Sequence, residues 1–189
     1  MTVEPFEVLV QPSLSTGALI DVSESRTADT LIIGENDEPL SIAIYLNPLS
    51  PYARDFQKLR MPVLIERFVR TGNLTIQLIT LPIDKYDGEA DVVRTTMCAT
   101  DQGKGYATHE RLYRDGVTSL DATTLSNLGV DIDAFDDCIA TMSGDVLIPL
   151  TVKAAADGVT LVPTYVIRGK TFVGLPTQAD LIGAINEAL

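Results

Sequence analysis

Apolar residues follow strand-type and helix-type spacing in turn along the chain. Residues 40–46 (Leu-Ser-Ile-Ala-Ile-Tyr-Leu) form a short, Ile-rich run ending at Asn47-Pro48, which is typical of a strand buried on both faces. Residues 74–81 alternate and predict a second strand, and the segment between the two carries apolar residues at helical spacing. Strand, helix, strand predicts a βαβ unit with parallel strands and a right-handed crossover.

The helix of this unit has a clear start. Ser50 is a favourable N-cap, and Pro51 loses nothing at the first helical position, where its missing N–H would be unpaired anyway. Pro62 lies inside the periodic segment and predicts a kink before the helix ends near Gly72-Asn73.

Residues 89–157 are helical in pattern, broken at glycines, with no low-complexity linker that would mark a separate domain. A hairpin follows over 165–174, and Thr177 caps a last helix. The order βαβ, helices, ββα predicts an α/β thioredoxin-like fold with an all-helical insertion, in one domain over 39–189.

Residues 1–38 are an N-terminal extension of that domain. In one interpretation the extension adds a strand to the sheet. Phe6–Val10 has the composition of a short strand, whereas the polar stretch Ser23–Asp29 is expected to be a loop.

Charge narrows the range of partners. The 189 residues include 26 Asp and Glu against 14 Lys and Arg, a formal charge of −12. Such a surface repels phosphate backbones and anionic lipids, so we expect no nucleic-acid partner. No apolar run approaches the roughly 20 residues of a membrane span, so none is expected.

The first residues contain neither a positive region nor a long apolar stretch. We therefore expect a cytoplasmic protein if Met1 is the native start, and a periplasmic or other extracytoplasmic one if a signal peptide has been removed.

Residues able to carry metal or nucleophilic chemistry are scarce. The chain has one histidine, His109, and two cysteines, Cys98 and Cys138, without a C-x-x-C pair. No metal site is expected, because zinc sites usually combine several such residues. His109 lies in a helix-like stretch without a neighbouring nucleophile motif, so we expect a solvated or half-buried helix residue.

Two segments far apart in the sequence resemble the DsbA-like branch of the thioredoxin superfamily. Ser50-Pro51-Tyr52-Ala53 stands where that family has Cys-Pro-Tyr-Cys, and Val162-Pro163-Thr164 resembles its cis-proline loop. Asp101-Gln-Gly-Lys104 also resembles its family counterpart. The likeness covers about residues 31–189, and it implies that the start of the first long helix faces the loop before the third strand of the fold.

The departure from the family pattern bears on activity. Thiol–disulfide exchange needs an attacking thiolate and a second, resolving sulfur, but Ser50 supplies a hydroxyl and Ala53 a methyl group. Either the protein is a naturally redox-inactive relative, or two active-site cysteines were replaced. In both cases a groove between Ser50, Tyr52 and Val162-Pro163 is expected to accommodate an extended peptide by strand addition, with no cofactor.

A second resemblance gives Ser50 another role. The kappa-class glutathione transferases and 2-hydroxychromene-2-carboxylate isomerases share this topology and have a serine like Ser50 that contacts the glutathione thiolate. The resemblance implies a glutathione-dependent enzyme, with a small thiol as ligand. A structural alternative is that Ser50 and Pro51 form a helix cap and nothing more.

Cys98 and Cys138 lie on two different predicted helices, each with an apolar face. Two buried thiols are one interpretation, since free cysteine is often buried and a reducing cytoplasm favours thiols. The resemblance to DsbA-like proteins implies the other, a structural disulfide that closes the insertion.

Overall fold

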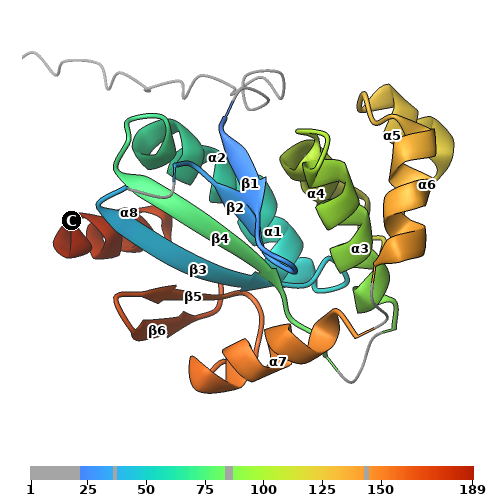
Figure 1. The fold of residues 1–189 in the computed structure, drawn as a ribbon. Helices are drawn as coiled ribbons and strands as arrows, with labels where there is room; N and C mark the ends of the chain where they lie inside the picture. Colours follow the sequence, from blue (N-terminus) through green and yellow to red (C-terminus); the bar gives the residue numbers. More distant parts are fainter. Residues whose placement is uncertain (1–21, 36–37, 84–86, 143–144) are drawn as a thin grey trace, which may run out of the picture.

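A single six-stranded sheet with the order β1-β2-β4-β3-β5-β6 runs through the computed structural model (Figure 1). The structure describes residues 22–35, 38–83, 87–142 and 145–189. The strands are β1 (Glu24–Arg26), β2 (Leu31–Ile33), β3 (Leu40–Leu46), β4 (Leu74–Thr80), β5 (Thr164–Ile167) and β6 (Lys170–Val173).

The centre of the sheet confirms the predicted βαβ unit. β3 and β4 are parallel and in register from Leu40 opposite Leu74 to Leu46 opposite Thr80. β5 pairs antiparallel with the other side of β3, and β6 closes the hairpin at the sheet edge. The fold is a mixed α/β thioredoxin-like fold with a helical insertion, as predicted.

The helix after β3 breaks where proline was predicted to kink it. α1 (Pro51–Leu59) ends at Arg60, and Pro62 lies in the first turn of the next segment. That segment is α2 (Met61–Leu64), which passes into the π-helical turn η2 (Ile65–Val69).

The remaining helices belong to the insertion and the C-terminus. They are α3 (Glu89–Thr100), α4 (Gly105–Asp115), α5 (Ala122–Asn127), α6 (Ile132–Thr141), α7 (Leu147–Ala156) and α8 (Gln178–Ala188). Figure 1 shows α3 to α6 gathered on one side of the sheet and α7 beside the β5–β6 hairpin. Among the helices of the described residues, none combines the length and apolarity needed to cross a bilayer.

Two hydrophobic clusters hold these layers together. The larger joins the sheet to α1, α2, α4, α7 and α8 through residues such as Ile44, Phe56, Leu112, Leu150 and Ile185. The smaller lies inside the insertion and contains Cys98, Ala99, Leu125, Val130 and Phe135. Burial of this kind contributes about 25 cal/mol for each Å² of apolar surface.

The N-terminal part departs from the expectation. Ser23–Asp29 is not all loop, because Glu24–Arg26 forms β1 and pairs antiparallel with β2. A three-residue strand is too short to show a period of two, and its charged side chains are explained by contacts with the insertion. The Glu24 carboxylate accepts hydrogen bonds from the backbone N–H groups of Gly105 and Tyr106, at 2.7 and 2.8 Å. Phe6–Val10 lies outside the described residues.

Candidate functional site

Ser50 begins α1 as predicted. Its backbone has extended dihedral angles, its Oγ accepts a hydrogen bond from the Ala53 N–H at 3.4 Å, and its C=O accepts one from the Arg54 N–H at 3.0 Å. Only 6% of the Ser50 surface is exposed. The hydroxyl therefore acts as a helix cap on the inner wall of the site, although the 3.4 Å bond is a long one.

The loop from β3 to α1 is held by Asn47, which the sequence pattern marked only as the end of a strand. The Asn47 side chain accepts a hydrogen bond from the Leu49 N–H at 2.9 Å and donates one to the Leu81 C=O at 3.0 Å. The Asn47 C=O accepts from the Ser50 N–H at 3.0 Å. An Asn immediately after a strand and before proline is a turn signal that would have identified it.

A buried carboxylate completes this network. Glu89, at the start of α3, accepts hydrogen bonds at 3.3 Å from the Asn47 side-chain amide and from the Ile83 N–H. Only 6% of Glu89 is exposed, and Asn47 is fully buried. Buried polar groups that are all paired make an arrangement rigid, so the loop that carries Ser50 is well fixed.

Arg54 connects the first turn of α1 with the insertion. Its Nη1 donates a hydrogen bond to the Pro48 C=O at 3.1 Å. Gly116, which ends α4 with φ of 67°, approaches so closely that a Cβ there would lie 3.0 Å from this same Nη1. A side chain at position 116 would thus push Arg54 away from the loop.

The second segment reaches the same end of the sheet. Thr164 lies opposite Tyr45, so the register continues to place Pro163 beside Leu46, the last residue of β3. The Val162–Pro163 peptide bond is cis, as the family resemblance implied. The Pro163 C=O accepts a hydrogen bond from the Gly174 N–H at 2.8 Å, toward β6.

The backbone of Val162 lies outside the hydrogen-bond network of the described residues. Within the described part of the chain, neither its N–H nor its C=O takes part in a hydrogen bond, while its side chain packs on the core. Such groups are normally paired unless solvent or a ligand reaches them. We call residues 47–53 together with 161–163 the mouth.

Exposed apolar side chains belong to both halves of the mouth. Tyr52 on α1 is 65% exposed and Leu161, just before the cis bond, is 59% exposed. Large apolar side chains with that much exposure are suited to contacts with a partner. Ala53, in contrast, is fully buried.

No sulfur lies in the mouth, because both cysteines are in the insertion. Cys98 on α3 and Cys138 on α6 form a disulfide with a Cα–Cα distance of 5.7 Å. Cys98 is fully buried, and its sulfur lies 3.4 Å from that of Met142. The pair joins two inserted helices over 40 residues of sequence and closes the smaller cluster.

The expectation for His109 was wrong, because the residue is buried with 3% exposure. α4 contacts both α1 and α3, and Tyr106, His109 and Tyr113 share one face of α4. The His109 ring stacks on Tyr113 with centroids 4.2 Å apart. Burial lowers the pKa of His109 to about 3, so the ring is neutral, and its Nδ1 has no hydrogen-bond partner among the described residues.

Solved structures with the same fold include BdbD and DsbA proteins. Oxidised BdbD from Bacillus subtilis superposes with a TM-score of 0.69 at 10% identity, over 88% of this chain and 96% of that one. DsbA from Chlamydia trachomatis gives 0.65 at 16%, over 87% and 93%. Alpha-DsbA1 from Wolbachia pipientis gives 0.66 at 16%, over 83% and 89%.

These identities are low, so the superpositions concern the fold. No match is found among curated proteins. A family model described as Thioredoxin matches residues 26–187, which include both halves of the mouth and the whole insertion. On this match, and with a fold of the DsbA type, the chain belongs to the thioredoxin family.

Proposed function

We propose that this protein is a DsbA-like binding protein that performs no dithiol exchange at the mouth and holds extended peptide segments there. The observation that carries the proposal is the combination at the mouth of two non-sulfur side chains, Ser50 and Ala53, with the backbone of Val162, which makes no hydrogen bond to any residue that the structure describes. Exchange requires two sulfurs, whereas strand addition requires only backbone groups and side-chain contacts.

The rigidity of the mouth supports this function. Asn47 and Glu89 fix the loop before α1, and the ladder between β3 and β5 positions Val162. A preformed site loses less conformational entropy when it binds an extended chain. Tyr52 would then provide an aromatic lip that packs on a side chain of the peptide.

We also infer a location outside the reducing cytoplasm. The Cys98–Cys138 disulfide supports this, because structural disulfides persist mainly in oxidising compartments.

The test is a titration with an unfolded polypeptide, the carboxymethylated B chain of insulin, followed by NMR of amide-labelled protein. We expect the amide signals of Tyr52, Val162 and Thr164 to shift together, and Tyr52→Ala to weaken binding several-fold. Leu59→Ala is the matched control, because Leu59 ends the same helix and is also exposed. Shifts confined to other surfaces would refute the proposal.

The glutathione-dependent alternative predicts a different response. A specific glutathione site would raise the melting temperature at millimolar glutathione, because a ligand that binds only the folded state stabilises it. A rise that Ser50→Ala abolishes, together with conjugation or isomerisation activity, would favour that enzyme over peptide binding. We expect no such rise.

A further inference from the structure

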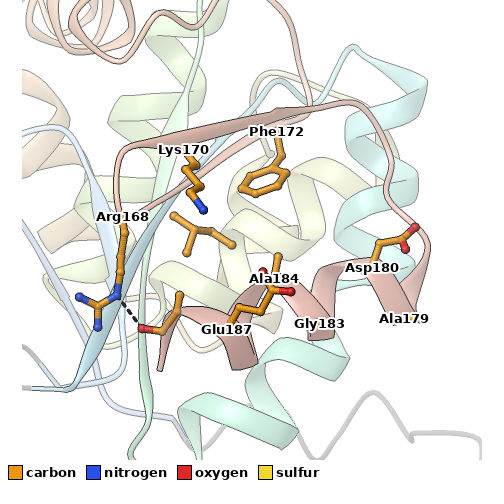
Figure 2. A pocket seen from close by; sticks show the side chains of 10 residues that line it. Arg168, Lys170, Phe172, Ala179, Asp180, Gly183, Ala184 and Glu187 are labelled. Atoms are coloured by element: carbon orange, nitrogen blue, oxygen red, sulfur yellow. Dashed lines mark hydrogen bonds between the residues drawn. The ribbon is translucent and has the colours of Figure 1, made fainter.

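A pocket of about 370 Å³ lies away from the mouth, between the β5–β6 hairpin and α8 (Figure 2). Lys170 and Phe172 point into it from β6, and Gly183 and Ala184 form part of the opposite wall on α8. The Phe172 ring stacks on Tyr165 of β5 with centroids 5.0 Å apart, so this wall is firmly placed. The volume falls in the range that binds small groups in proteins.

The pocket borders an open edge of the sheet. β6 is the last strand, and its two-residue loop pairs Ile167 with Lys170. Because hydrogen-bonded pairs alternate along an antiparallel ladder, the backbone groups of Thr171 and Val173 point outward. Apart from the β5–β6 ladder, no hydrogen bond within the described ranges involves the backbone of β6.

Gly183 faces open space, and no neighbouring atom requires a glycine at this position. A Cβ at this position would meet no atom within 4 Å. Glycine inside a helix is about 1 kcal/mol less favourable than alanine. The space in front of it is therefore available to a side chain from outside.

The charge at this edge differs from the rest of the protein. Residues 158–179 contain no Asp or Glu, although the chain has 26, and they contain Arg168 and Lys170. Arg168 donates a hydrogen bond to the Ala188 C=O at 2.6 Å, whereas Lys170 has no ion pair among the described residues. On the α8 side, Asp180 and Glu187 also line the pocket, and the Asp180 carboxylate accepts a hydrogen bond from the Thr177 hydroxyl at 2.6 Å.

We propose that the edge of β6 is a second docking site, which takes an extended segment of a partner polypeptide as a seventh, antiparallel strand. Residues opposite Lys170 and Phe172 would face the pocket, so an acidic residue and an aromatic one fit there. The residue opposite Val173 lies on the other face, where Val173 is 62% exposed, and an apolar side chain fits there. Threonine suits the position opposite Thr171, because Thr–Thr pairs across strands are favourable. Read in its own direction, the segment then carries the pattern Val-Phe-Thr-Glu.

The first experiment measures binding of a fluorescent decapeptide with central Val-Phe-Thr-Glu to the full chain by anisotropy. N-methylation at Val and Thr, opposite the outward groups of Val173 and Thr171, is expected to weaken binding at least about tenfold. N-methylation at Phe and Glu is the matched control, since those amides point away from β6, and it should leave affinity within about twofold. Equal effects from both peptides would overturn the proposal.

The second experiment fills the pocket. Gly183→Leu should fold, because its Cβ has open space and leucine favours helices, and it should weaken binding of the Phe peptide at least tenfold. A peptide with Ala in place of Phe should be insensitive to the variant, and Ala155→Leu on the exposed face of α7 is the control. Lys170→Glu should reverse the preference for Glu over Lys in the peptide.

The proposed site and the mouth use different residues, so separate variants distinguish them. Tyr52→Ala should leave decapeptide binding unchanged, whereas Gly183→Leu should leave binding of the insulin B chain unchanged. If the decapeptide does not bind but the chain dimerises in sedimentation velocity and Val173→Glu makes it monomeric, the edge binds a second copy and the proposal is wrong.

Discussion

Arg26 of β1 and Asp101 at the end of α3 face each other in a two-point ion pair, with Nε–Oδ1 and Nη2–Oδ2 distances of 2.6 and 2.7 Å. Two residues earlier, Glu24 accepts the first free N–H groups of α4. An anion at the start of a helix interacts favourably with its dipole. β1 therefore fastens the turn between α3 and α4 to the edge of the sheet.

We predict that Asp101→Asn lowers the free energy of unfolding by about 1 kcal/mol at pH 7. The two-point contact with Arg26 makes this ion pair stronger than a single contact, whereas its partial exposure to solvent weakens it. The hydrogen bond from Arg26 lowers the pKa of Asp101. This contribution is thus present above the carboxyl pKa of the unfolded chain, near 4, and is lost as the pH falls through the lower folded value. Urea titrations of the wild type and the variant at pH 7 and pH 3 measure the loss of stability and its decrease at low pH.

Asp91→Asn is the control for that substitution. Asp91 contacts Arg94 through one oxygen at 3.4 Å and is more exposed than Asp101. Its loss should cost less than half as much. Equal losses of stability for the two variants would mean that the Arg26–Asp101 ion pair contributes no more than an ordinary surface ion pair.

His109 should make the fold sensitive to acid. Its pKa is about 3 in the folded chain and 6.5 ordinarily, so the unfolded chain binds the proton first as the pH falls. Stability is therefore lost between about pH 6.5 and 3, by at most about 1.4 kcal/mol for each pH unit. His109→Phe, which preserves the stack on Tyr113, should flatten the dependence between pH 7 and 5. Parallel pH curves for the two proteins would disprove this role.

The Cys98–Cys138 disulfide should stabilise the insertion. A cross-link over 40 residues removes chain entropy worth about 3–4 kcal/mol from the unfolded state. We expect the double variant Cys98→Ala, Cys138→Ala to show a loss of this size in guanidinium titrations. Adding reductant to the unfolded wild type should reproduce the loss on refolding. Unchanged stability in both experiments would mean that α3 and α6 are held by packing alone.

Ser50 should contribute to stability as a helix cap. Ser50→Ala is expected to cost about 0.5–1 kcal/mol, at the low end of the range for caps because the bond to Ala53 is long. Asp121→Ala removes a cap with a 2.7 Å bond from α5 and is the comparison. A loss above 2 kcal/mol for Ser50→Ala would show that the hydroxyl does more than cap α1.

Local patterns predicted the centre of the fold well. The apolar run 40–46, the Ser50-Pro51 pair and the hairpin over 165–174 each carry a signal that acts within a few residues. The start of α6 and α8 at Asp131 and Thr177 follows the same capping rules. These elements agree with the fold because their local preferences and tertiary contacts point the same way.

Local sequence patterns could not predict features that depend on contacts between residues far apart in the chain. β1 exists because Glu24 and Arg26 meet α4 and Asp101, which are about 80 residues away in the chain. His109 is buried because α4 packs between two other helices, which the spacing of polar residues around it did not indicate. The Asn47–Glu89 contact likewise joins two elements that no local signal connects.

An insulin-reduction assay on the wild type and on the double variant Ser50→Cys, Ala53→Cys tests whether the mouth is inactive for lack of sulfur. We predict no turnover by the wild type, because its one disulfide lies in the insertion and the mouth holds no sulfur. We predict clear turnover by the variant, because its two new sulfurs lie at the start of α1, which follows the same end of β3 that Pro163 adjoins. A melting curve confirms that the variant folds. Turnover by the wild type, or a folded variant without activity, would refute the proposed function of the mouth.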